Sequence, residues 1–179
     1  VYWNFIDWGY VSNEGESDMA LNLHLHIALG AFSAWCRLLG RAREAEEAEA
    51  FRRDVKRAVA AYFASCRGDW AHIGLHRAAL ALGEGFFSGK EREACIRAVK
   101  QHYLSCFPND VSAPRLDCPS REDTRLITPY FSHFAFKALW ENGEGDFVLD
   151  QYRSCWGWLL EQDNTWLEVF DTRWSHCHQ

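Results

Sequence analysis

Glu168 lies in the most aromatic stretch of this chain, which reads NTWLEVFDTRWSHCHQ over residues 164–179. Trp166 and Phe170 are two residues away on either side of it. Rings that exclude water disfavour the charged form of a carboxyl group, which suits proton exchange near neutral pH. We therefore interpret Glu168 as a candidate acid or base of the kind that cleaves glycosidic bonds. The competing interpretation is an amphipathic turn whose aromatic residues fill the core while Glu168 faces water.

The histidines form poor metal sites. His24 and His26 are two residues apart, so on a helix they point to different faces. His72 and His76 would share a face of one helix, but they lack the glutamate of an HExxH motif and an evident third ligand. His176 and His178 lie too close together for the usual zinc spacing. From these spacings we expect no metal, and we expect no cofactor. No GxSxG motif or glycine-rich phosphate loop occurs, so a serine or cysteine nucleophile site has no support either.

The composition is that of one soluble domain that binds neither nucleic acid nor membrane. The chain has 179 residues, 48% of them hydrophobic, and a net charge of −6, which argues against binding to a phosphate backbone. Nine Trp, twelve Phe and six Tyr provide more flat surfaces than a helical domain needs, and sugar rings stack on such surfaces.

Seven cysteines are scattered without a CxxC pair, which favours unpaired thiols in a reducing compartment. The cytoplasm is therefore favoured, although the sequence leaves the location open. The chain begins at Val1 inside an apolar run and ends at Gln179 directly after the SHCH block. We expect it to be one partial domain, residues 1–179, of a longer polypeptide.

Apolar residues recur at helical spacing in six segments, listed in chain order as 19–39, 42–66, 72–82, 90–107, 128–142 and 146–160. Ser17 or Asp18 could cap the first, Gly40 would end it, and Thr128-Pro129 is a strong helix start. Residues 1–11 read as aromatic and irregular. No strand pattern of comparable length occurs, so the fold class is all-α.

The helices alternate between more apolar and more charged, which predicts three consecutive αα-hairpins. Apolar helices forming an inner ring and charged helices forming an outer ring would make an (α/α)6 toroid, of which three hairpins are about half. A compact six-helix bundle fits the same pattern.

Four blocks of the sequence resemble, in order, the catalytic domain of bacterial α-L-rhamnosidases, glycoside hydrolase family 78 of the six-hairpin glycosidases. The blocks are Phe5-Ile6-Asp7-Trp8, Thr128-Pro129-Tyr130-Phe131, Trp156-Gly157-Trp158-Leu159, and Thr165–Asp171 followed by Ser175-His176-Cys177-His178. In the family pattern a Trp directly precedes the glutamate, whereas here Trp166 is one place further away.

The resemblance implies a role for each matching residue. Glu168 matches the general base that activates water in an inverting hydrolysis. His178 matches a histidine that contacts the sugar, and Asp7 and Trp8 match a pair at the rim of the sugar pocket. Tyr130 is a further candidate for lining that pocket.

The general acid is expected, by the same resemblance, in a loop before Val1. The chain alone is therefore expected to be inactive and to have a carbohydrate as its substrate. Two alternatives remain: a carbohydrate-binding module without activity, and a helical scaffold that binds a protein. Apolar flanks of the inner helices could also join two copies into a homodimer.

Overall fold

The structure is a computed structural model of the chain, and it describes residues 3–8, 10–13, 18–115, 125–162, 166–170 and 177–178. The helices are α1 (Met19–Leu38), α2 (Ala42–Cys66), α3 (Trp70–Gly83), α4 (Gly89–Leu104), α5 (Pro129–Glu141), α6 (Gly145–Gln151) and α7 (Gly157–Gln162), with a π-helical segment η1 (Tyr152–Trp156) between the last two. The strands are β1 (Trp3–Asp7), β2 (Tyr10–Asn13), β3 (Trp166–Leu167) and β4 (Cys177–His178). The predicted all-α class is confirmed.

The helix starts that the sequence predicts are made by side-chain caps. The Asp18 carboxylate accepts hydrogen bonds from the backbone N–H groups of Ala20 and Leu21 at the start of α1. The Thr128 hydroxyl accepts one from the N–H of Phe131, with Pro129 in the first turn of α5. These bonds satisfy N–H groups that have no partner inside the helix.

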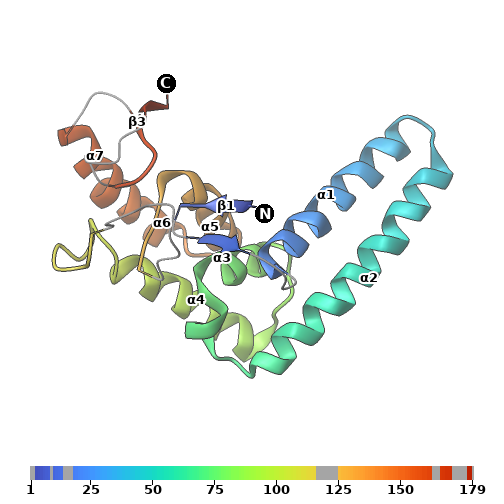
Figure 1. Cartoon of the computed structure of the whole chain (residues 1–179), viewed down its shortest axis with the longest axis horizontal. Helices are drawn as coiled ribbons and strands as arrows, with labels where there is room; N and C mark the ends of the chain where they lie inside the picture. The colour runs from blue at the N-terminus through green and yellow to red at the C-terminus, as the bar shows by residue number, and fades with distance from the viewer. Residues whose placement is uncertain are drawn as a thin grey trace.

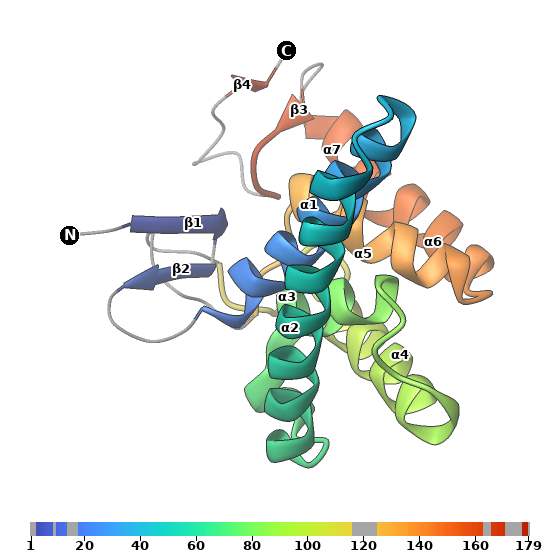
Figure 2. The ribbon, with the colours of Figure 1, turned by 90° about the vertical axis from the view of Figure 1, so that its right-hand side faces the viewer.

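Figure 1 shows α1 and α2 running side by side out of the body as an arm, while α3, α4 and α5 lie together at its base. Seen at a right angle to that view, α1 and α2 lie in front of the body, and β1 and β2 form a separate hairpin at one side (Figure 2). Helices α3 and α5 supply much of the core, since Ile73, Leu80, Phe131 and Leu139 are almost completely buried. The three hairpins occur in the predicted order, and their arrangement as half of a closed ring stays a prediction.

The prediction that residues 1–11 are irregular was wrong. Strands β1 and β2 form an antiparallel hairpin with an irregular register between Phe5 and Asp7. Such a bulge redirects side chains, and it accounts for Ile6 and Asp7 both being buried although they are neighbours in a strand. Aromatic and β-branched residues favour strands, and the sequence reading gave this preference too little weight.

Gly74 interrupts the helix that the sequence predicts over residues 72–82. Its φ of 72° and ψ of 168° lie in a region that is essentially restricted to glycine. His72 and His76 therefore do not share one continuous helical face. His72 is exposed and lies near Tyr62, whereas His76 turns into the protein interior.

Replacing Gly74 with Ala tests this break. No atom lies within 4 Å of the position of an added Cβ, so the cost comes from backbone strain alone. We expect Gly74→Ala to lower the free energy of unfolding by about 1–3 kcal/mol in urea denaturation. Gly157→Ala is the matched control, because Gly157 also has open space but has a helical φ of −57°. That variant should be neutral or stabilised by up to about 1 kcal/mol; equal losses in both variants would contradict the account.

Candidate functional site

A buried carboxylate, Asp7, connects three elements that are distant in the sequence. Its side chain is about 3% exposed, and its Oδ2 lies 3.0 Å from Nε2 of His76 in α3. The hydroxyl of Thr128 lies 2.9 Å from both carboxylate oxygens. We call Asp7, His76 and Thr128 the carboxylate cluster.

The cap of α5 fixes the direction of the bond between Thr128 and Asp7. The Thr128 oxygen already accepts the N–H of Phe131, so its single hydrogen is available to donate to the Asp7 carboxylate. Asp7 thereby lies at the N-terminus of α5, where the helix dipole favours a negative charge. The bond from His76 requires a proton on Nε2, because an ionised carboxylate only accepts hydrogen bonds.

The hydroxyl groups of Tyr103 and Ser132 form hydrogen bonds that hold the Thr128 cap in place. The Tyr103 hydroxyl of α4 donates to the Ser132 hydroxyl over 2.8 Å, and Ser132 donates to the backbone carbonyl of Thr128. Complete burial raises the pKa of the Tyr103 hydroxyl far above its ordinary value, against the opposing effect of the Ser132 bond. Tyr103 therefore stays a neutral donor, and α4 is tied to the start of α5.

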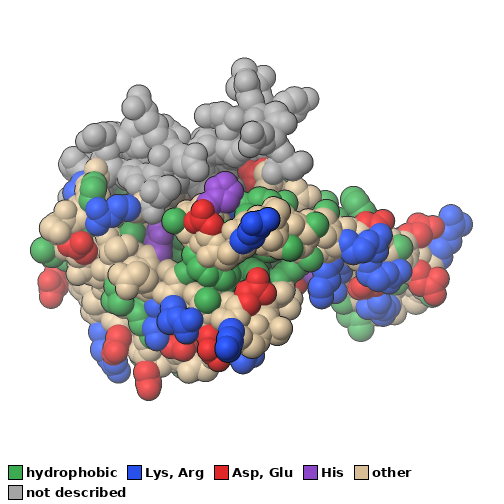
Figure 3. All heavy atoms as spheres, turned by 90° about the horizontal axis from the view of Figure 1, so that it is seen from below, with side chains coloured by type: hydrophobic (Ala, Val, Ile, Leu, Met, Phe, Trp, Pro, Cys, Tyr) green, Lys and Arg blue, Asp and Glu red, His purple; other side chains and the backbone are tan. Residues whose placement is uncertain are grey.

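Rings and imidazoles surround the carboxylate cluster. The ring of His76 lies 4.2 Å from that of Phe131, and Phe131 contacts Phe134. Tyr130 and His24 both meet Phe134 edge to face, with centroids 5.9 Å and 5.5 Å away. Figure 3 shows histidine side chains reaching the surface on one face of the molecule.

The candidate residues from the resemblance differ in exposure. Tyr130 is 60% exposed, Trp8 is partly buried, and Asp7 is buried. Exposed aromatic rings can hold the flat face of a ligand. Tyr130 and Trp8 therefore have ring surface that a ligand can reach, whereas Asp7 has almost none.

Glu168 lies in a bend directly after β3. It is partly buried, while its neighbours Leu167, Val169 and Phe170 are almost completely buried. Phe170 is held by the rings of Trp156 and Trp158, with centroids 5.1 Å and 6.5 Å away. The carboxylate is thus carried by backbone whose flanking side chains anchor it in the core.

Arg115 anchors the same bend. Its guanidinium lies over the ring of Phe107, 3.6 Å from the centroid, and donates to the carbonyl of Phe170 over 3.3 Å. A cation held against a ring and a carbonyl group has little freedom to move. The backbone that carries Glu168 is therefore held in place through Phe170, whose ring packs on two tryptophans and whose carbonyl accepts from Arg115.

Pairing of β3 with β4 brings the His178 block beside the Glu168 block. Trp166 pairs with His178 and Leu167 with Cys177 in an antiparallel register. The backbone of His178 is therefore only a few residues from Glu168 across the ladder. The side chain of His178, and residues Ser175 and His176, lie outside the described residues.

Sequence reasoning selected Asp7, Trp8 and Tyr130 together, and the structure places them around the start of α5. It missed His76 and the role of Thr128 toward Asp7, which join Asp7 across 69 and 121 residues. The signal for Thr128 was present as a helix cap, but a cap gives no information on which carboxylate it meets. In Figure 1, β1 and β3 both lie above α3 and α4.

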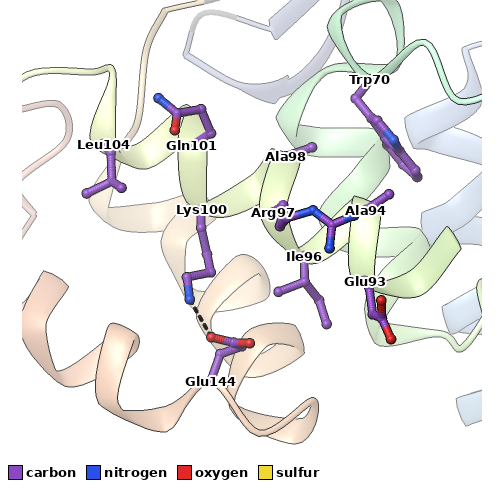
Figure 4. A pocket seen from close by; sticks show the side chains of 10 residues that line it. All are labelled: Trp70, Glu93, Ala94, Ile96, Arg97, Ala98, Lys100, Gln101, Leu104 and Glu144. Carbon is purple, nitrogen blue, oxygen red and sulfur yellow. Dashed lines mark hydrogen bonds and ion pairs between the residues drawn. The ribbon is translucent and has the colours of Figure 1, made fainter. Parts of the chain in front are cut away.

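A groove of about 720 Å³ on α4 is a second candidate surface (Figure 4). Its lysine, Lys100, already forms an ion pair with Glu144 and lies over the ring of Phe147. A surface ion pair contributes little to stability, and its opposite charges leave no net charge to attract a ligand. The groove also lacks buried polar groups such as those around Asp7.

Metal ligands and disulfides do not organise the part of the chain that the structure describes. No group of three or more His, Cys, Asp or Glu side chains lies there in an arrangement that could hold a metal ion. Cys36, Cys66, Cys95, Cys106 and Cys155 are free thiols, and burial raises the pKa of the Cys95 thiol to about 12.

Comparison with known proteins identifies no relative, because no family model, no curated protein and no solved structure matches the chain. The resemblance to α-L-rhamnosidases therefore rests on the sequence blocks alone.

Substitutions of Thr128 test the carboxylate cluster. Thr128→Val keeps the shape of the side chain but removes both the helix cap and the donor to Asp7. We expect it to lower the free energy of unfolding by about 2–4 kcal/mol in urea denaturation, the combined scale of a lost cap and an unsatisfied buried charge. Thr128→Ser keeps the hydroxyl and should lose only about 1 kcal/mol. If Val and Ser cost the same, the hydroxyl is not the stabilising group.

His24 predicts a dependence of stability on pH. Burial lowers its pKa below the ordinary 6.5, with nearby His76 acting in the same direction and Asp18 opposing them. Between the lowered pKa and 6.5 the unfolded chain binds more protons than the folded chain, so stability rises with pH through that window. Conversely, stability is lost as the pH falls below 6.5.

An NMR titration checks this directly, by following the ring proton of His24 in the folded chain and in concentrated urea. We expect the folded chain to titrate at the lower pH. His24→Gln should show a smaller loss of stability than the unchanged chain between about pH 7 and pH 5. Identical titration midpoints in the two states would contradict the assignment.

Proposed function

We propose that this chain is part of an inverting glycoside hydrolase that cleaves terminal α-L-rhamnosides, with Glu168 as the general base. In this proposal the three hairpins form about half of an (α/α)6 toroid. The sugar lies at the face where the β1 and β3 segments meet the helices. The chain needs no cofactor for this chemistry, because water is the nucleophile and carboxyl groups transfer the protons.

The position of Glu168 carries the proposal. A general base has to reach water and yet be held in place, and Glu168 is partly exposed between three buried neighbours. Phe170, two residues after Glu168, anchors this backbone in the core through the ring of Trp156.

The expected sugar contacts are Trp8, Tyr130 and His178. Trp8 and Tyr130 provide surfaces for the apolar face of a sugar ring, and they follow Asp7 and Thr128 of the carboxylate cluster by one and two residues. His178 is in a strand whose backbone pairs beside the Glu168 segment, and the resemblance gives its imidazole a contact with the same sugar.

Asp7 does not serve as the general acid in this proposal. It is buried, and its carboxylate oxygens already lie within hydrogen-bond distance of His76 and Thr128, so it does not reach a glycosidic oxygen at the surface. The acid instead comes from a segment before Val1, about 6.5–9.5 Å from Glu168 across the sugar. The chain alone would then bind the sugar without cleaving it.

The same observation on Asp7 favours a second function, carbohydrate binding without hydrolysis. A module of this kind would use Trp8 and Tyr130 for stacking and would have no general acid at all. The two functions differ in whether a longer polypeptide that includes the preceding segment turns over a rhamnoside.

The decisive experiment measures hydrolysis of p-nitrophenyl α-L-rhamnoside by the chain extended upstream of Val1. We expect turnover with inversion at the anomeric carbon, followed by NMR, and a kcat at least about a hundredfold lower in Glu168→Gln. Glu161→Gln is the matched control, because Glu161 is an exposed carboxylate on α7 and should leave kcat unchanged.

Quenching of tryptophan fluorescence by L-rhamnose separates the two functions. Binding without turnover in the extended chain supports the binding module. Turnover that survives Glu168→Gln contradicts the role of Glu168, and neither binding nor turnover contradicts both functions.

A further inference from the structure

Helix α1 is apolar on nearly all sides, yet much of it lies at the surface. Arg37 is its only Asp, Glu, Lys or Arg residue. Only 28% of its most apolar window is buried, although a helix that is apolar all round normally lies inside a protein. Trp35 is 70% exposed and Leu39, directly after α1, is 76% exposed.

The apolar residues on the outer side of α1 follow the spacing of a helix–helix seam. They are Leu21, Leu25, Ala28, Phe32, Trp35 and Leu39, separated alternately by four and three residues. This 3.5-residue period keeps one stripe facing a partner helix along its whole length. Leu25 is partly buried against the core, and the other five are exposed.

The stripe is self-complementary when two copies run antiparallel. Its six positions are symmetric about Gly30, so an antiparallel pair places Leu21 opposite Leu39, Leu25 opposite Trp35 and Ala28 opposite Phe32. Each large side chain thereby meets a smaller or equal one, which close packing requires. A parallel pair would instead place Trp35 against Trp35 and Phe32 against Phe32. The antiparallel pair thus meets the requirement of a twofold interface, in which the same surface of both copies has to be self-complementary.

The exposed area is sufficient for such an interface. Leu21, Phe32, Trp35, Leu38 and Leu39 are between 46% and 85% exposed. Since a large side chain presents roughly 150–250 Å², they offer on the order of 600 Å² together. Over two copies this amounts to about 1,200 Å², the lower end of the range for a stable interface, and Ala28 in the stripe and Ala31 beside it supply further area.

A membrane is the other environment that would cover an apolar helix, and α1 is long and apolar enough to span one by length and composition alone. Its neighbour α2 argues against that. Helix α2 packs along α1 with charged residues on its exposed side, among them Arg43, Glu47, Arg53 and Arg57. Taking α1 into hydrocarbon would take these charges with it, at a cost of several kcal/mol.

We propose that two copies of this chain associate through antiparallel α1 helices, with Ala28 of each copy packed against Phe32 of the other. The occupant of the exposed face is therefore a second copy. The arms that stand clear of the body in Figure 1 would lie against each other.

Sedimentation velocity of the full chain over a range of concentrations tests the proposal, with circular dichroism to check that each variant folds. We expect a dimer for the unchanged chain. Phe32→Ala should leave a gap opposite Ala28, and Ala28→Phe should place two Phe rings against each other. Each should raise the dissociation constant by at least about tenfold.

The double variant Ala28→Phe with Phe32→Ala restores the contact with the two residues exchanged, so it should recover most of the dimer. Val111→Lys and Leu160→Lys are controls, because both residues are exposed and apolar but lie outside α1. They should leave the dissociation constant unchanged.

A monomer at all concentrations would overturn the proposal. So would a dimer that none of the α1 variants weakens, since its interface would lie elsewhere. Flotation of a monomeric chain with lipid vesicles, lost in Trp35→Lys, would overturn it in favour of a membrane surface.

Discussion

A buried carboxylate is costly to hold, because it loses its hydration and has to recover those interactions from the protein. Asp7 recovers them from His76 in α3 and Thr128 in α5, and so it can be buried only when β1, α3 and α5 are all in place. The Tyr103–Ser132 bonds add α4 to the same assembly. The mutual arrangement of most of the body therefore depends on satisfying a single carboxylate.

This constraint also organises the proposed site. The Asp7 segment ends at Trp8, and the helix that Thr128 caps begins with Pro129 and Tyr130, so fixing the carboxylate fixes both exposed rings. Glu168 is held independently, by Phe170 and Arg115. A site built on two separate anchors can position a sugar and a water molecule without either anchor having to move, which is the pre-organisation that hydrolysis needs.

The sequence predicted the features that depend on neighbouring residues. The periodicity and caps gave the helices, and Thr128-Pro129 marked the start of α5 to the residue. Longer-range features were not accessible in the same way. His76 was considered only as a metal ligand beside His72, because the break at Gly74 depends on a φ angle that the residue type permits but does not require. The hairpin of β1 and β2 was missed because its two strands are short and need each other to form.

The most direct test of the account is a crystal structure of the chain with L-rhamnose bound. We predict that the sugar lies against Trp8 and Tyr130, above the Asp7 carboxylate bonded to His76 and Thr128, with the Glu168 carboxylate facing the anomeric carbon across a water molecule. A sugar bound elsewhere, for example in the α4 groove, or a Glu168 side chain turned away from the Trp8 surface, would contradict it.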